Sequence, residues 1–179
     1  THYNEEEIFA NLHIKFKKKV KNLLTIIIPR HVERTNEIIQ MLNKKKLKFV
    51  KHSENKKNLK DCDIYIVDSY GESKSFYKIS NVVFLGGSLV SKGGQNPLEA
   101  LRLGCNTMHG NFTFNFTDIY KMLEKENLSL RVSNSKDLGE KTYSLLKNKK
   151  NNSKKIKKLK IMGNLILRKN FEEIKKIVK

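Results

Sequence analysis

The stretch NVVFLGGSLVSKGGQNPLEALRLG, residues 81–104, decides the fold, because it joins an apolar strand to a helix through a glycine-rich loop. Residues 81–87 form a continuous apolar run of strand length, and a helix is expected from Pro97 to Leu103. The paired glycines between them allow the backbone to turn tightly or to approach a ligand closely. The loop carries neither the Walker-type Gly-Lys-Ser/Thr signature nor the Gly-x-Gly-x-x-Gly dinucleotide fingerprint.

The same alternation of strand and helix continues outward along the chain. Continuous apolar strands that alternate with helices favour a parallel sheet covered on both faces. We therefore predict an α/β fold, a Rossmann-like doubly wound parallel sheet, over residues 1–150, and a basic C-terminal helix over 151–179 that packs on or near it. The expected strands are 23–28, 46–50, 63–68, 81–87, 106–110 and 128–132, and the expected helices are 32–44, 72–79, 97–103, 116–126, 135–148 and 153–178.

The composition points to an anionic partner. The 179 residues include 37 Lys and Arg against 18 Asp and Glu, a formal net charge of +19. Such an excess suits a nucleic acid, a membrane surface or a phosphorylated substrate, although a lysine-rich solvated surface explains it equally well. Cys62 and Cys105 lie in apolar surroundings, which favours a reducing compartment over a disulfide framework or a metal site. No apolar run approaches the length of a transmembrane helix, and no signal peptide is expected.

Unusual residues gather where the expected strands end. Residues 29–31, 68–72, 86–88 and 109–110 combine glycine, charged and hydroxyl side chains directly after four strands. Ligands of doubly wound sheets bind beyond the carboxyl ends of the strands. Because these clusters fall on one edge, we predict a ligand site there.

The start of the helix after the glycine loop allows two roles for Glu99. Asn96 suits the N-cap position, Pro97 the first helical position, and Glu99 the third position of a capping box. Alternatively, the Glu99 carboxylate accepts hydrogen bonds from ligand hydroxyls while the free N–H groups of the helix start face a phosphate. The spacing alone does not separate these roles.

Several motifs together resemble the bacterial 3-deoxy-D-manno-octulosonic acid (Kdo) transferases that act on lipid A precursors. The motifs are THYNEEE (1–7), PRHVER (29–34), DSYGE (68–72), FLGGSLVSKGGQNPLEA (84–100) and GNFTFNF (110–116). The resemblance implies a GT-B glycosyltransferase of lipopolysaccharide synthesis. In it, this chain would be the C-terminal, donor-binding domain that holds CMP-Kdo, and an N-terminal acceptor domain would lie elsewhere.

The resemblance also implies donor-binding residues. Arg30 would meet the negative charge of the donor, Asn96 and Glu99 would hold its ribose or sugar, and Gly86, Gly87 and Ser88 would form the turn that faces the phosphate. The remaining matches are Gly71, Glu72 and Asn115, together with Ser69 and Tyr70, which replace Thr and Met of the family pattern.

This sequence also departs from the family pattern at several positions, which affects the expected fine selectivity for the donor and not the expected class. The departures are Ser69 and Tyr70, Gln95 in place of His, Ala100 in place of a frequent Pro, and Asn111 and Phe112 in place of a Pro-His pair.

The family mechanism is inverting and uses no metal and no cofactor. Its catalytic base is a carboxylate of the N-terminal domain, so no catalytic residue is expected in this chain. His31 is expected to be structural, fixing the Arg30 loop, and no role beyond local hydrogen bonding is expected for His2 or His109. The acidic run of residues 5–7 reads as the polar first turn of a helix whose Ile8, Leu12 and Phe16 face the core.

The C-terminal helix carries a possible apolar stripe of Ile156, Leu159, Met162, Ile166 and Ile174. The stripe either packs on the domain or contacts an anionic membrane face, where the acceptor lipid lies. The resemblance implies a cytoplasmic protein, peripheral on the inner face of the bacterial inner membrane.

The alternative functions are another GT-B glycosyltransferase or a nucleotide-sugar epimerase. A nucleic-acid-binding protein is less favoured, because the lysines lie mostly apart from the aromatic residues of the ligand edge.

Overall fold

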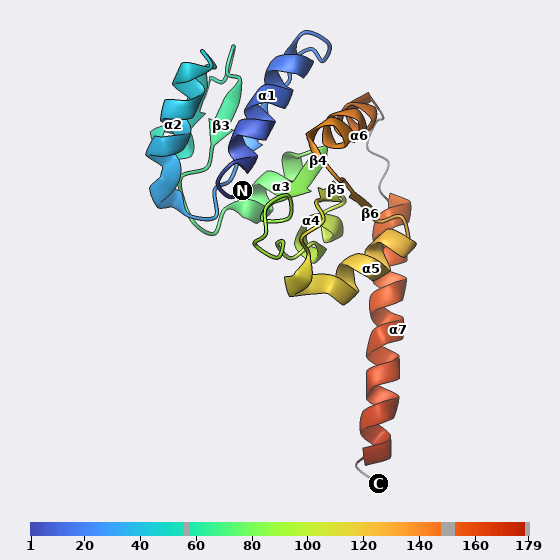
Figure 1. The fold of residues 1–179 in the computed structure, drawn as a ribbon. Helices are drawn as coiled ribbons and strands as arrows, with labels where there is room; N and C mark the ends of the chain where they lie inside the picture. Colours follow the sequence, from blue (N-terminus) through green and yellow to red (C-terminus); the bar gives the residue numbers. More distant parts are fainter. Residues whose placement is uncertain (56–57, 148–152, 178–179) are drawn as a thin grey trace.

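The computed structural model describes residues 1–55, 58–147 and 153–177, which alternate between strands and helices as expected (Figure 1). Single turns of 3₁₀-helix, η1 (Val32–Arg34), η2 (His52–Glu54) and η3 (Phe114–Phe116), lie in the connections. The helices and strands are α1 (Glu5–Lys17), β1 (Thr25–Ile27), α2 (Thr35–Lys44), β2 (Phe49–Lys51), β3 (Ile64–Ile66), α3 (Ser73–Ile79), β4 (Val82–Leu85), α4 (Leu98–Arg102), β5 (Asn106–His109), α5 (Thr117–Lys125), β6 (Ser129–Arg131), α6 (Ser135–Lys147) and α7 (Ser153–Ile177).

All strand pairs are parallel, as the apolar runs predicted, but the strands form two sheets. The strand orders are β1-β3-β2 and β4-β5-β6, and no ladder joins β1 to β4 within the described residues. The expectation of a single continuous sheet is therefore wrong at its centre.

Residues at the start of the chain occupy the junction between the sheets. The main-chain nitrogen of Thr1 donates to the Ile28 carbonyl (2.6 Å), and the Arg30 N–H donates to the Thr1 carbonyl (2.9 Å). On the other side, a Cβ on Gly86 would lie 2.9 Å from the Thr1 Cα. The first residues are thus wedged between the end of β1 and the end of β4.

Helix α1 packs against both halves of the fold, between α2 and α6 (Figure 1). Ala10 belongs to the apolar core around β1 and β3, whereas Leu12 and Phe16 belong to the core around β5 and α6. The burial of Leu12 and Phe16 confirms the predicted core face of this helix.

A buried polar group fixes α1 to the N-terminal ends of β1 and β3. His13 contacts the Thr25 hydroxyl through Nδ1 (3.0 Å) and the Asp63 carboxylate through Nε2 (3.3 Å). Asp63 also accepts the Lys48 N–H (2.9 Å) and pairs with Lys17. Burial lowers the pKa of His13, which favours the neutral ring. These bonds satisfy groups that would otherwise be costly to bury, so they hold the helix in one position.

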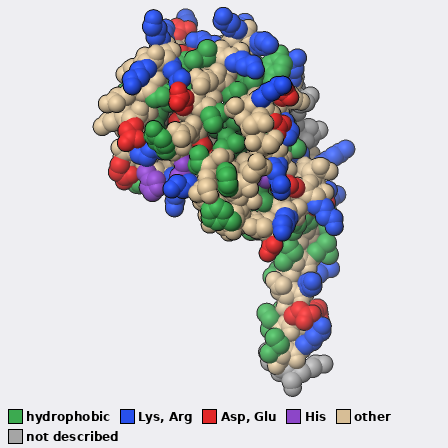
Figure 2. Space-filling model, in the orientation of Figure 1, with side chains coloured by type: hydrophobic (Ala, Val, Ile, Leu, Met, Phe, Trp, Pro, Cys, Tyr) green, Lys and Arg blue, Asp and Glu red, His purple; other side chains and the backbone are tan. Residues whose placement is uncertain are grey.

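Helix α7 packs through its first turns only. Leu159 and Met162 contact the core cluster of α4 and α5, and Lys158 forms an ion pair with Glu126 (2.6 Å). Beyond them the helix projects from the domain with apolar side chains along it (Figures 1 and 2). Ile166 and Ile174 are 46% and 56% exposed. The predicted stripe is therefore divided between a packed part and an exposed part.

The predicted domain boundary between residues 150 and 151 lies outside the described residues. None of the helices in the described part of the chain is long and apolar enough to cross a membrane.

Candidate functional site

The loops at the carboxyl ends of β1, β3, β4 and β5 contact one another. The Tyr70 hydroxyl donates to Glu33 (3.1 Å), which joins the β3 loop to the β1 loop. Lys74 lies 3.5 Å from Glu99, which joins the start of α3 to α4. The side-chain amide of Asn115 donates to the Lys92 carbonyl (3.1 Å) and ties the loop after β5 to the glycine loop. The predicted clusters thus lie along one edge.

Arg30 follows β1 and is exposed. Its backbone N–H is held by Thr1, and within the described residues its guanidinium has no hydrogen bond or ion pair. His31 lies against His2, with the two ring centroids 6.2 Å apart. The loop is therefore braced through its backbone and His31, while the Arg30 side chain is available to an anionic ligand.

The β3 loop is anchored by its first residue and open at its tip. Asp68 accepts hydrogen bonds from the N–H (2.9 Å) and hydroxyl (2.6 Å) of Ser53. Burial raises the pKa of Asp68, but the Ser53 bonds outweigh this and lower it overall. Gly71 has φ +85° and open space around it, and Glu72 precedes α3. The Ser69 Oγ is buried and has no hydrogen-bond partner in the described part of the chain.

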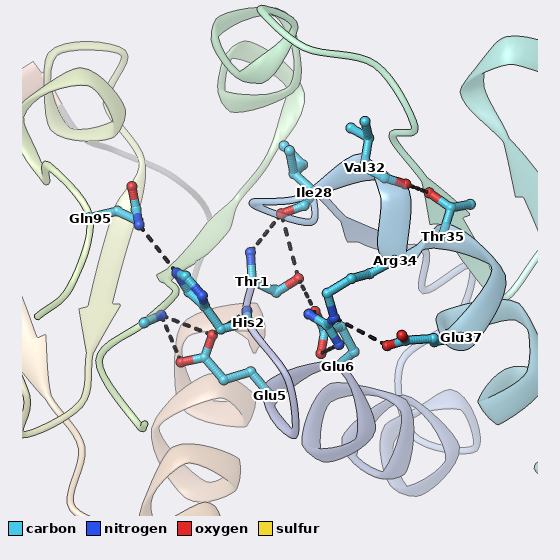
Figure 3. Close-up of polar contacts among 11 residues, drawn as sticks. Thr1, His2, Glu5, Glu6, Ile28, Val32, Arg34, Thr35, Glu37 and Gln95 are labelled. Atoms are coloured by element: carbon cyan, nitrogen blue, oxygen red, sulfur yellow. Dashed lines mark hydrogen bonds and ion pairs between the residues drawn. The ribbon is translucent and has the colours of Figure 1, made fainter. Parts of the chain in front are cut away.

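The Gly86–Ser88 turn after β4 is stabilised by groups of the protein itself. Glu5 accepts the Gly87 N–H on both carboxylate oxygens (2.8 and 2.9 Å) (Figure 3). One of these oxygens also accepts the Leu89 N–H (3.3 Å). The Ser88 hydroxyl donates to the Leu85 carbonyl and accepts the Gly110 N–H (2.8 Å). The donors of this turn that would suit a phosphate are already engaged here.

The predicted capping box does not form at α4. Asn96 Oδ1 accepts the Leu98 N–H (3.0 Å) in a turn before the helix, and Pro97, rather than Asn96, precedes the first helical residue, Leu98. Glu99 does not bond back to Asn96; its carboxylate is half-exposed and faces Lys74. The capping role of Glu99 is therefore wrong, and its carboxylate is free to meet a ligand.

Asn115 shapes the glycine loop from the opposite side. Gly93 has φ +84°, and a Cβ there would lie 2.3 Å from the Asn115 Nδ2. The Gly93 carbonyl also accepts the Asn115 N–H (3.1 Å). Gly93 is required because the Asn115 amide lies directly on its backbone.

Sequence reasoning missed the part played by the first residues. Glu5, Glu6 and Glu7 form the predicted polar first turn of α1, but Glu5 and Glu6 are only 0% and 3% exposed, and their burial was not predicted. His2 lies 3.5 Å from the Gln95 side chain and against Gly87 (Figure 3). The THYNEEE motif belongs to the family resemblance and therefore pointed to this segment, but none of its residues was predicted to lie at the site.

The fold and the edge define a class: a Rossmann-like α/β domain with a ligand edge at the carboxyl ends of two parallel sheets. No protein-family model matches the sequence. Within residues 1–55, 58–147 and 153–177, no cluster of three His, Cys, Asp or Glu side chains could hold a metal ion.

Comparison with known proteins gives the particular family. The chain is 36% identical over 156 residues to a 3-deoxy-D-manno-octulosonic acid transferase of Haemophilus influenzae and 33% identical over 157 residues to one of Rickettsia prowazekii. These matches cover 87% and 88% of the chain and 36% and 33% of the relatives. A bifunctional glycosyltransferase/methyltransferase of Fusobacterium nucleatum is 32% identical over 87% of the chain and 24% of its own length.

A solved structure matches the same region. The C-terminal CMP-Kdo binding domain of WaaA from Acinetobacter baumannii superposes with a TM-score of 0.80 and 27% identity, covering 87% of this chain and 81% of that one. The chain is therefore a homologue of the C-terminal domain of the Kdo transferases, and it spans about a third of the length of the two transferases above. The family resemblance and the fold class are confirmed.

Proposed function

We propose that this chain is the donor-binding domain of a Kdo transferase, which transfers Kdo from CMP-Kdo to a lipid A precursor. The match to the CMP-Kdo binding domain of Acinetobacter baumannii WaaA carries the proposal, because it covers 87% of this chain with a TM-score of 0.80. The matches give no support to an epimerase, another GT-B enzyme or a nucleic-acid-binding protein.

The residues of the edge suit a nucleotide sugar with one phosphate. Arg30 offers an exposed guanidinium, without a partner among the described residues, for the phosphate charge, and it would stabilise the charge that grows there as CMP leaves. Asn96 and Glu99 offer polar side chains for the hydroxyl groups of the ribose or sugar. The remaining contacts are proposed for Ser69, Tyr70, Gly71, Glu72 and Asn115. The polar groups of the Gly86–Ser88 turn are engaged within the protein, so Gly86, Gly87 and Ser88 are proposed to shape the edge of the site.

The base that deprotonates the acceptor hydroxyl is proposed to lie outside these 179 residues, in an N-terminal acceptor domain. Transfer is proposed to invert the anomeric centre and to need neither a metal ion nor a cofactor. The active enzyme would then combine the two domains, with the donor held between them.

The projecting part of α7 suits a peripheral position on the inner face of the bacterial inner membrane. Exposed Leu165, Ile166 and Phe171 accompany lysines along this segment, and an apolar, basic helix surface binds anionic lipid. Sedimentation with vesicles containing phosphatidylglycerol tests this, and equal recovery with neutral vesicles would contradict it.

The chain is expected to bind CMP weakly, and more tightly than UMP or AMP. The order rests on the cytosine base, since all three nucleotides carry one phosphate and the homologous domain of Acinetobacter baumannii binds CMP-Kdo. Isothermal titration calorimetry with the three nucleotides measures the order of affinity, and thermal shifts with UDP and ADP test the other donor classes. Equal or tighter binding of the other nucleotides would refute the cytidine assignment.

Glu99→Gln is expected to weaken CMP-Kdo binding and to leave stability nearly unchanged. The carboxylate caps nothing, and its ion pair with Lys74 is exposed and worth at most about 1 kcal/mol. Loss of charge-assisted bonds to ligand hydroxyls costs about 1.5–3 kcal/mol of binding. Calorimetry and urea unfolding of both proteins separate the effects, with Lys74→Gln as the control for the ion pair. Unchanged donor affinity in folded Glu99→Gln would remove Glu99 from the site.

A further inference from the structure

The two sheets that carry the candidate site share no ladder, so something else must fix the distance between their loops. Arg30 follows β1 in one sheet, and the Gly86–Ser88 turn follows β4 in the other. The first turn of α1 lies between these two loops (Figure 3). Two neighbouring glutamates of that turn bond in opposite directions.

Glu5 is directed toward the second sheet. Its carboxylate accepts the N–H groups of Gly87 and Leu89 on one side and that of His2 (2.9 Å) on the other. These N–H groups form a small anion-binding nest of the kind that often receives a phosphate. Here the nest is filled by a carboxylate of the same chain, so Glu5 sets the shape of the glycine turn.

Glu6 is directed toward the first sheet. Its two oxygens accept from the Arg34 guanidinium (3.0 and 3.4 Å), and one also accepts the Thr1 hydroxyl (2.9 Å). Arg34 ends η1, the turn that begins two residues after Arg30, and it also reaches Glu37 (3.3 Å). Glu6 therefore holds the segment that carries the Arg30 loop.

Burying two adjacent carboxylates is costly unless each is hydrogen-bonded or paired. Glu5 and Glu6 are hydrogen-bonded or paired only while the Arg30 loop and the Gly86–Ser88 turn keep their present positions. Helix α1 itself cannot shift freely, because His13 and Asp63 fix its other end. The neighbouring Glu7 is different: its side chain is 56% exposed, and among the described residues it pairs only with Lys45 (2.9 Å).

We propose that Glu5 and Glu6 are positioning residues for the donor site, setting the separation of the Arg30 loop and the Gly86–Ser88 turn across the junction of the two sheets. The inference rests on the proposed donor-binding function. It also assigns the donor phosphate to Arg30 and away from the Gly87 nest, because Glu5 already occupies that nest.

The experiment compares Glu5→Gln, Glu6→Gln and Glu7→Gln, the last as the matched exposed control. Calorimetric titration with CMP is done at a temperature where circular dichroism shows each protein folded. We expect CMP affinity to fall about tenfold or more in the first two variants, the scale of one charge-assisted hydrogen bond. Glu7→Gln should bind within about twofold of wild type, since exposed ion pairs contribute little. Glu5→Asp and Arg34→Lys replace any glutamine variant that fails to fold.

A second measurement needs no ligand. In ¹H–¹⁵N spectra of the free protein, the Gly87 amide proton should move upfield in Glu5→Gln and stay in place in Glu7→Gln, because a hydrogen bond to a carboxylate deshields it. A lower unfolding temperature with wild-type CMP affinity would reduce both residues to structural braces and overturn the inference. Failure of the conservative variants to fold would also overturn it.

A different result is expected if the chain is not a donor-binding domain. Wild-type protein that does not bind CMP would refute the donor-binding role, whatever the variants do. The Gly87 signal would still decide whether Glu5 shapes the glycine turn, and an unmoved signal in Glu5→Gln would overturn that assignment.

Discussion

Gly110→Ala is expected to destabilise the domain by at least about 3 kcal/mol, at the upper end of what overpacking costs. A Cβ on Gly110 would lie 2.1 Å from the Ser88 carbonyl oxygen and 2.7 Å from the Leu89 nitrogen. These are backbone atoms of the glycine turn and cannot rotate away. The Gly110 N–H also donates to the Ser88 hydroxyl (2.8 Å), so moving residue 110 breaks the bond that joins the ends of β4 and β5.

Urea unfolding followed by circular dichroism measures this effect. Gly163→Ala is the control, because Gly163 lies in α7 with nothing within 4 Å of its added Cβ. That substitution should raise helix stability by up to about 1 kcal/mol. A Gly110→Ala protein whose free energy of unfolding lies within about 1 kcal/mol of wild type would contradict this prediction. It would show that the glycine turn shifts at little cost, so that the tight packing of the loops after β4 and β5 does not matter for folding.

The 179-residue chain is expected to give no detectable Kdo transfer, whereas a protein extended at its N-terminus to the length of its relatives transfers Kdo. Transfer needs a base within hydrogen-bond reach of the acceptor hydroxyl, and such a base contributes roughly 10²–10⁴-fold. The acidic first turn of α1 cannot provide it. Glu5 and Glu6 are buried and bonded, and Glu7 pairs with Lys45.

The assay uses CMP-Kdo and a lipid A precursor with both proteins. An extended protein carrying Arg30→Ala serves as the control that transfer depends on this domain. The 179-residue chain alone would also fail to orient the two substrates and to exclude water, because it would enclose the donor on one side only. Transfer by the short chain at a rate comparable to that of the long one would overturn the proposed division of labour.

Local patterns in the sequence determined the class of fold. The apolar runs at 23–28, 63–68 and 81–87 became parallel strands, because such runs are stable only when both faces are buried. The glycine pairs marked the loop, since positive φ depends on a single residue type, and Asn96 and Pro97 marked the start of α4 to within one residue. The motifs likewise placed the candidate edge, because the carboxyl ends of parallel strands meet on one side of a sheet.

Tertiary structure alone decided what each polar side chain does. From the sequence, Glu5 and Glu6 are only the polar first turn of a helix. Their burial is possible because N–H groups and a guanidinium from residues 28 to 84 positions away satisfy them. At the division between the two sheets, Thr1 bonds to Ile28, another contact between distant residues. The Glu99 carboxylate faces Lys74 and does not cap α4. The packed part of the α7 stripe ends at Met162, the last of its residues that contacts the domain core. Sequence periodicity records which face of an element is apolar, but only the packed chain fixes which distant group meets it.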